Sequence, residues 1–252
     1  DVVTCAGTNM QSKALLKVRV DAGVGSRRRA ADAIMRGAVR VNGVVVSDLR
    51  CAVDVGRDSV EVDGYKLDIR DKASVYLMFN KPAGVLSTVC DDRGRTTVID
   101  ILPERYRNIG LHPVGRLDKD STGLLLLTND GEFTYRLTHP KFEQEKEYLV
   151  RIDAALKPHE LRALERGVEL EDGVTREAVV KPIRSPQLFN YSIMLHEGKK
   201  RQVRRMFSSL GYRVIALKRV REGNLKLGTL VEGKVRELTA REFHEVLQGR
   251  VI

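Results

Sequence analysis

Residues 115–131 read GRLDKDSTGLLLLTNDG, and this stretch decides how the rest of the chain is interpreted. Four consecutive leucines, Leu124–Leu127, are bounded by Gly123 and by a turn-forming Thr-Asn-Asp-Gly sequence. A short apolar run between turn signals predicts a buried strand. The loop before it carries Arg116 and Asp118, and a loop that enters a buried strand is held rigidly. Spacing alone favours a loop salt bridge over a catalytic acid, so the choice depends on the rest of the chain.

The composition predicts two domains and a polyanionic partner. A chain of 252 residues is long for one compact domain, and its 42% of hydrophobic residues suffices for a core. The formal charge is +10 and the isoelectric point is near 9.6, which favours nucleic acid as the partner. Aromatic residues make up only 5%, so we expect binding through phosphates and shape rather than through base stacking.

Several other classes of protein find no support in the composition. No uncharged apolar stretch of about eighteen residues occurs, so no membrane-spanning helix is expected. The three cysteines are widely spaced without a Cys-x-x-Cys pair, so no zinc site is expected. Sparse cysteines favour the cytoplasm, and an organelle matrix or stroma would suit the chain equally after removal of a transit peptide. The glycines form no dinucleotide or phosphate-loop motif, so no cofactor is expected.

The N-terminal part predicts a disordered tail, residues 1–11, followed by a small α/β module, residues 12–68. Two segments with helical spacing, 12–22 and 26–36, each end before a glycine. Two hairpins follow, with tight turns at Asn42-Gly43 and Asp63-Gly64 between β-branched residues.

A cluster of arginines lies at the start of the second predicted helix. Arg27, Arg28 and Arg29 fall in its first turn, where cations oppose the helix dipole. A polyanion bound there would explain this placement, because the free N–H groups of a first turn also attract phosphate. We therefore expect these three arginines to contact RNA.

The module resembles the RNA-binding domain of the ribosomal-protein-S-four type. The residues that carry the resemblance are AGVGSRRRAADAIMRGAVRVNGVVV at 22–46 and DSVEVDG at 58–64. The resemblance implies that the module docks on structured RNA through its second helix and its hairpin.

Residues 69–74 predict a linker, and residues 75–252 predict a second domain of the α+β class. Short strands, helices and many Asp-Gly, Asn-Gly and Glu-Gly turns favour a mixed, largely antiparallel sheet flanked by helices. The polar segment 87–97 is expected to be an exposed, mobile loop. The expected strands are 75–81, 124–127, 146–152, segments near Val168, Val179 and Ile193, 212–220 and 235–238; the expected helices are 98–102, 131–138, one from Pro158, 199–210 and 239–248.

A dense group of cations marks the helix expected over 199–210. Five of seven residues are basic, which favours an RNA phosphate surface over an ordinary solvated helix face. Helical spacing places three of the arginines on one face, and one of them could turn inward to pair with an acid. The cations are Lys199, Lys200, Arg201, Arg204 and Arg205.

The second domain resembles the RsuA/RluB type of ribosomal RNA pseudouridine synthase. The resemblance runs from about residue 75 to the C-terminus and is carried by five motifs. They are NKPAGVLST at 80–88, the quoted stretch at 115–131, RLTHPKFEQEKEYLV at 136–150, HEGKKRQVRRMF at 196–207 and LKRVREGNLKLGTL at 217–230.

The resemblance implies a cofactor-free isomerisation of uridine to pseudouridine in ribosomal RNA. Asp118 would be the catalytic aspartate, and Arg204 the basic residue that pairs with it. Tyr148 would stack on the base and act in the final proton removal. Arg116 would hold the flipped-out nucleotide. The segments DDRGRTTVIDIL and RQVRRM favour the large-subunit RNA.

Other interpretations remain open from the residues alone. A non-catalytic RNA-binding or ribosome-assembly factor would show the same charge, acting on ribosomal RNA or an assembly intermediate. A metal-dependent RNA hydrolase would use Asp118 and Asp130 as ligands. Turn positions favour a shaping role for Asp120 and Asp130 instead, so no metal site is expected. The protein is expected to be a monomer.

Overall fold

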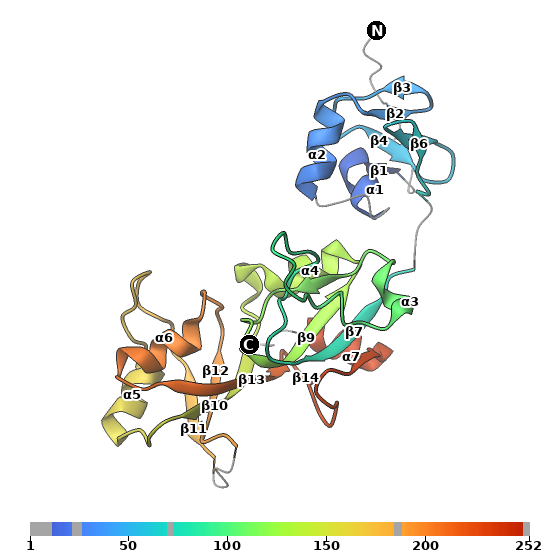
Figure 1. The fold of residues 1–252 in the computed structure, drawn as a ribbon. Helices are drawn as coiled ribbons and strands as arrows, with labels where there is room; N and C mark the ends of the chain where they lie inside the picture. Colours follow the sequence, from blue (N-terminus) through green and yellow to red (C-terminus); the bar gives the residue numbers. More distant parts are fainter. Residues whose placement is uncertain (1–11, 22–26, 70–72, 184–187, 249–252) are drawn as a thin grey trace. The chain divides into compact units, whose positions relative to one another are not determined.

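The computed structural model describes residues 12–21, 27–69, 73–183 and 188–248 (Figure 1). The chain forms two compact units, of which the first extends to Ser74. The second consists of Val75–Arg107 together with the chain from Leu111 onward. Among the described residues, no helix combines the length and the apolar character needed to cross a bilayer. The predicted tail, residues 1–11, and residues 70–72 of the predicted linker lie outside the described residues.

The first unit packs two helices against short strands. Its core holds Leu15, Ile34 and Val60, all fully buried. Both predicted hairpins are confirmed, and Asn42 and Gly43 adopt φ values of 50° and 81°, as a tight hairpin turn requires. The elements are β1 (Ser12–Ala14), α1 (Leu15–Asp21), α2 (Arg27–Met35), β2 (Val39–Val41), β3 (Val44–Val45), β4 (Ala52–Asp54), β5 (Val60–Val62) and β6 (Tyr65–Lys66).

The first predicted helix is shorter than its apolar spacing indicates. Residues 12–14 form β1, which pairs antiparallel with β4, and α1 begins only at Leu15. Backbone pairing with a distant strand therefore overrides the local helical pattern at this end. Ser26, the first residue of the second predicted helical segment, lies outside the described residues.

The second unit is built on a nine-stranded sheet in the order β11-β12-β10-β13-β9-β7-β15, with β14 beside β13 and β8 beside β9. The β13–β9 pair is parallel, and the other pairs in this sheet are antiparallel, so the predicted α+β class with a mixed sheet is confirmed. The strands are β7 (Tyr76–Lys81), β8 (His112–Val114), β9 (Thr122–Thr128), β10 (Lys146–Ile152), β11 (Val179–Pro182), β12 (Tyr191–Leu195), β13 (Val214–Glu222), β14 (Leu225–Lys226) and β15 (Val235–Glu237).

Helices cover this sheet over two hydrophobic clusters. One cluster includes Leu164, Met206 and Ile193 and lies beneath α5 and α6; the other includes Phe133, Leu126 and Val246 and lies beneath α4 and α7. The helices are α3 (Glu104–Arg107), α4 (Gly131–Thr138), the 3-10 turn η1 (Pro140–Phe142), α5 (Pro158–Arg166), α6 (Gln202–Ser209) and α7 (Ala240–Leu247).

The quoted leucines are confirmed as a buried strand, since Leu124–Leu127 are all 0% exposed within β9. β9 lies between β7 and β13 near the middle of the sheet (Figure 1). Successive side chains of a strand point to opposite faces, so the burial of all four leucines means that both faces of β9 are covered. Asp130, at the far end of this strand, accepts hydrogen bonds from the N–H groups of Glu132 and Phe133 and caps α4. The predicted turn role of Asp130 is therefore confirmed.

Three predicted elements differ from the structure. Residues 98–102 form turns, and the helix α3 follows Pro103 instead, because proline suits the start of a helix. Val168 lies in an irregular segment after α5, where its N–H group bonds the side chain of Thr175 rather than a strand. The helix expected from residue 199 begins at Gln202, because Arg201 adopts a left-handed conformation with φ 51°.

Candidate active site

A cavity of about 450 Å³ opens at the N-terminal end of β9. Its walls come from the loop before β9, from β10, from the segment before α6 and from β13. The structure thus brings together residues that lie as much as about one hundred positions apart in the chain. Among the lining residues are Arg116, Asp118, Tyr148, Lys199, Arg201 and Arg219.

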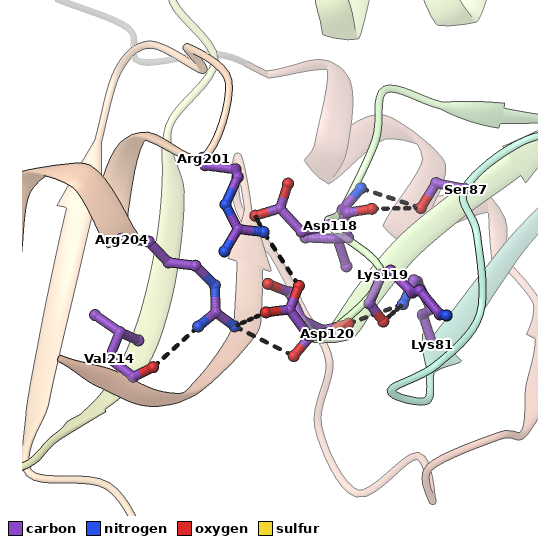
Figure 2. A network of polar contacts seen from close by, with 10 residues as sticks. Lys81, Ser87, Asp118, Lys119, Asp120, Arg201, Arg204 and Val214 are labelled. Carbon is purple, nitrogen blue, oxygen red and sulfur yellow. Dashed lines mark hydrogen bonds and ion pairs between the residues drawn. The ribbon is translucent and has the colours of Figure 1, made fainter.

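The loop that carries Asp118 is fixed through its main chain. The Ser87 hydroxyl donates to the Leu117 carbonyl at 2.9 Å and accepts from the Leu117 N–H at 3.1 Å (Figure 2). The Ser121 N–H closes a turn on the Asp118 carbonyl at 3.1 Å. These bonds leave the Asp118 carboxylate at the cavity wall, with its side chain 27% exposed. The role of Ser87 was missed, because no local pattern links position 87 to position 117.

Lys81 supports the same loop from inside the protein. It ends β7, is 0% exposed, and its ammonium group donates to the carbonyls of Pro82, Lys119 and Ser121 at 2.9, 3.2 and 2.8 Å. A lysine that closes an otherwise apolar strand was the available signal for such a role. Burial lowers the pKa of Lys81 to about 8, against the opposing charges of Asp120 and Asp118.

The Lys81→Met variant is expected to lose about 2–4 kcal/mol of unfolding free energy at neutral pH, because three carbonyl groups lose a buried donor. Denaturant unfolding measures this loss. Lys119→Met is the control, since the Lys119 side chain is exposed and only its carbonyl meets Lys81. It should stay within about 0.5 kcal/mol of the wild type.

The same pair of variants predicts a pH dependence. An unfolded lysine titrates near ~10.4, so between about pH 8 and 10 the unfolded chain binds more protons than the folded chain. The unfolding free energy of the wild type therefore rises with pH in this window relative to Lys81→Met, by at most about 3 kcal/mol. If the difference in unfolding free energy between the wild type and Lys81→Met became smaller between about pH 8 and 10, it would contradict the lowered pKa of Lys81.

Arg201 is the cation that approaches Asp118. Its Nη1 lies 3.9 Å from Asp118 Oδ2 and 3.3 Å from Asp120 Oδ1 (Figure 2). The left-handed backbone of Arg201 costs free energy for a residue with a side chain. Such strain at the cavity wall is typical of a functional position.

The predicted pairing of Asp118 with Arg204 is wrong for this structure. Arg204 Nη2 meets Asp120 instead, at 3.2 Å from Oδ2 and 3.2 Å from the carbonyl oxygen, and its Nη1 donates to the Val214 carbonyl at 3.0 Å. Partial burial opposes ionisation of Asp120, but the charges of Arg204 and Arg201 hold its pKa below the usual range. Asp120 lies in the turn at 119–120, as predicted, and is in addition an ion-pair partner of α6.

The remaining cations of the 199–205 segment lie on different surfaces. The Lys199 ammonium group donates to three carbonyls of the turn 172–174 at 3.2–3.3 Å, and Arg205 holds the Asp172 carboxylate at 2.7 and 2.9 Å. Lys200 and Arg116 are exposed, and Arg116 also lines the cavity. The expected single helical face of Arg201, Arg204 and Arg205 does not form, because α6 starts after Arg201. Arg201 and Arg204 both meet Asp120, whereas Arg205 meets Asp172.

Tyr148 reaches the cavity from β10, two strands away from β9. In the sheet it stands opposite Ile193 of β12 and Arg219 of β13. Burial raises the pKa of the Tyr148 phenol, and the positive charge of Arg219 partly offsets this effect. Arg219 and the nearby Glu222 are each 1% exposed. They were not predicted as site residues, because charged residues in a strand normally indicate a solvent-exposed face.

The arginines predicted to contact RNA in the first unit belong to the first turn of α2. The side chains of Arg28 and Arg29 are exposed.

Comparisons with known proteins give the chain its class. Residues 75–209 match the model of the RNA pseudouridylate synthase family, and residues 15–58 match that of the S4 domain. A solved structure described as a pseudouridylate synthase is 32% identical, covers 92% of this chain and 99% of its own, and superposes with a TM-score of 0.66.

Curated relatives are similar to this chain over nearly its full length. Ribosomal large subunit pseudouridine synthase B of Bacillus subtilis is 44% identical over 244 residues, which cover 94% of this chain and 96% of the relative. An uncharacterised RNA pseudouridine synthase of Mycobacterium tuberculosis is 42% identical, with 93% of each chain covered. The chain belongs to the RNA pseudouridine synthase family, and it is an isomerase of RNA uridine with an N-terminal RNA-binding domain.

Proposed function

We propose that this protein isomerises a uridine of large-subunit ribosomal RNA and that Asp118 is its catalytic residue. The observation that carries the proposal is the shared cavity, in which the Asp118 carboxylate and the Tyr148 side chain face one space lined by cations. The name of the Bacillus subtilis relative, which specifies the large subunit, supports the choice of RNA.

The chemistry requires no net oxidation or reduction. The bond between uracil N1 and ribose C1′ breaks, a bond between C5 and C1′ forms, C5 loses a proton and N1 gains one. An ionised Asp118 serves either by attacking C1′ or by removing the proton next to it. Arg201, whose guanidinium lies 3.9 Å from this carboxylate, places a positive charge beside it at the cavity wall. Tyr148 provides an aromatic surface for the base and an oxygen that accepts the C5 proton.

The target base must leave its stack to enter the cavity. Extrusion costs on the order of a few kcal/mol, which stacking on Tyr148 and charge contacts to the nucleotide offset. A cavity of about 450 Å³ lies in the range of small-ligand sites. The exposed Arg116 and Lys200 are placed to meet the flanking phosphates, and Arg28 and Arg29 of α2 provide a second RNA contact.

Transcripts of large-subunit and small-subunit ribosomal RNA, incubated separately with the purified protein, test the proposal. We expect pseudouridine, located by carbodiimide-dependent reverse-transcription stops, at one or a few positions of the large-subunit RNA. Product on the small-subunit RNA alone would overturn the choice of RNA.

The alternatives predict other outcomes in the same assay. An RNA-binding or assembly factor without activity would bind both transcripts and form no pseudouridine. A metal-dependent hydrolase would cleave the strand and stop when a chelator is added. Asp130 is used as the cap of α4 and accepts a hydrogen bond from the Tyr76 hydroxyl at 2.8 Å, which argues against its pairing with Asp118 as a metal ligand.

A further inference from the structure

A buried ion pair on β13 takes no part in the function proposed above. Arg219 Nη2 lies 3.4 Å from Glu222 Oε2, and each side chain is at most 2% exposed. Neither of these two atoms has a hydrogen-bond partner among the described residues. Removing two charges from water costs about as much as their attraction returns, so stability alone does not explain the pair. Both residues line the cavity that holds Asp118 and Tyr148.

Arg219 contacts both strands that position the catalytic groups. On one side its Nε donates to the Leu124 carbonyl at 2.7 Å, and its backbone packs on Gly123, immediately after the Asp118 loop. On the other side it stands opposite Tyr148 in the β10–β13 ladder. Arg219 thus connects the strand that follows Asp118, which its side chain contacts, with the strand that carries Tyr148, which it pairs with in the sheet.

Charged groups surround the Tyr148 phenol from three elements. Arg219 and Glu222 act from β13, and the Asp118 carboxylate acts from the loop before β9. Lys146 lies on the same strand as Tyr148 and stands opposite Glu222. Arg201 reaches the phenol only indirectly, through its contact with Asp118. Arg219 is therefore the cation that favours the ionised phenol most directly, whereas Glu222 and Asp118 oppose ionisation.

We propose that Arg219 is a positioning residue that orients Tyr148 against Asp118 and stabilises the negative charge of the phenol oxygen, with Glu222 limiting this effect. The proposal rests on the proposed isomerase function. In the final step the C5–H bond breaks and its electron pair restores the C5–C6 double bond of the uracil. The electron pair of the C6–N1 double bond moves to N1, which takes a proton from solvent, and the C5 proton passes to the phenolate oxygen of Tyr148. A nearby guanidinium lowers the free energy of that phenolate.

Opposite pH shifts in two variants test the proposal. Arg219→Met removes the cation that favours the phenolate, and Glu222→Gln removes an anion that opposes it. The measured quantity is the single-turnover rate of tritium release from RNA labelled at uracil C5, with enzyme in excess, from about pH 7 to pH 11. Because burial raises the pKa of the Tyr148 phenol, the midpoint is obtained by fitting the rising part of the rate profile. We expect the midpoint of the rate profile to move up by about one pH unit in Arg219→Met and down in Glu222→Gln.

Three further variants separate this role from a structural one. Arg219→Lys keeps the charge and should keep the wild-type midpoint, even if its rate falls. Tyr148→Phe lacks the titrating phenol, so its rate of tritium release should no longer rise with pH in this range. Arg221→Met is the matched control: Arg221 lies on the same strand and pairs with Glu145 and Glu147 at 3.1 Å, but it does not line the cavity. It should lower the unfolding midpoint temperature and leave the pH profile unchanged.

The outcomes separate failure of this inference from failure of the proposed function. A wild-type protein that releases no tritium would overturn the proposed function itself. If the wild type is active, two results would overturn the role of Arg219. In one, Arg219→Met and Glu222→Gln both have the wild-type midpoint; in the other, both variants shift the midpoint in the same direction. If Arg219→Met does not fold, Glu222→Gln decides alone: a downward shift supports the proposal, and an unchanged or raised midpoint overturns it.

Discussion

The Asp118→Asn protein is expected to bind ribosomal RNA with an affinity within about threefold of the wild type and to form pseudouridine at least about 10³-fold more slowly. The amide has nearly the shape of the carboxylate, and the loop around it is fixed by main-chain bonds to Ser87 and by Lys81. The geometry should therefore survive while the negative charge at the cavity wall is lost. Single-turnover pseudouridine formation and RNA binding, measured on the same preparation, check both halves of this prediction.

Asp120→Asn is the matched control for this experiment. Asp120 lies on the same loop and contacts the same arginine, Arg201, but its side chain is directed to α6 and half exposed. We expect this variant to lose about tenfold or less in rate, because only the ion pairs to Arg201 and Arg204 weaken. Equal losses in Asp118→Asn and Asp120→Asn would show that the charge of the loop, rather than one carboxylate, matters.

The Gly123→Ala variant is expected to be destabilised by about 3 kcal/mol or more and to lose most of its activity. A Cβ at this position would lie 2.1 Å from the Arg219 carbonyl oxygen and 2.7 Å from its nitrogen, and Gly123 has φ +104°. The methyl group can be accommodated only if β9 and β13 separate. That separation would also move the Asp118 loop away from Tyr148.

Thermal and denaturant unfolding measure the loss of stability in Gly123→Ala. Gly131→Ala is the control, because a Cβ there meets no atom within 4 Å and the position begins α4. The control is expected to be as stable as the wild type or slightly more stable, since alanine favours a helix. If Gly123→Ala were as stable as the control, β9 and β13 would be able to separate at a lower cost in free energy than their close contact indicates.

Much of the second domain follows from local sequence patterns. The four leucines predicted β9, the sequence KEYLVRI predicted β10 over the observed bounds, and the helix expected over 239–248 is found as α7. These features are visible in the sequence because each depends on residues within a few positions of one another. The motifs around Asp118 and Tyr148 also indicated the family before any contact was known.

Contacts between distant segments could not be predicted in the same way. The partner of Arg204 was expected to be Asp118, and the structure gives Asp120 and the Val214 carbonyl. The two acids are only two positions apart, so the choice depends on which of them the loop turns toward α6. That orientation depends on Ser87 and Lys81, whose partners in the loop lie 30 and 38 positions away in the chain.

The sequence by itself determined the family, the division into an RNA-binding module and an α+β domain, and the candidate site residues Asp118 and Tyr148. Local periodicity, turn residues and motif spacing are enough for that. The tertiary structure alone decided that Arg201 rather than Arg204 lies beside Asp118, and that Arg219 and Glu222 are buried at the cavity. The physical reason is that burial and charge pairing depend on which strands become neighbours, and the parallel contact of β13 with β9 joins residues almost one hundred positions apart.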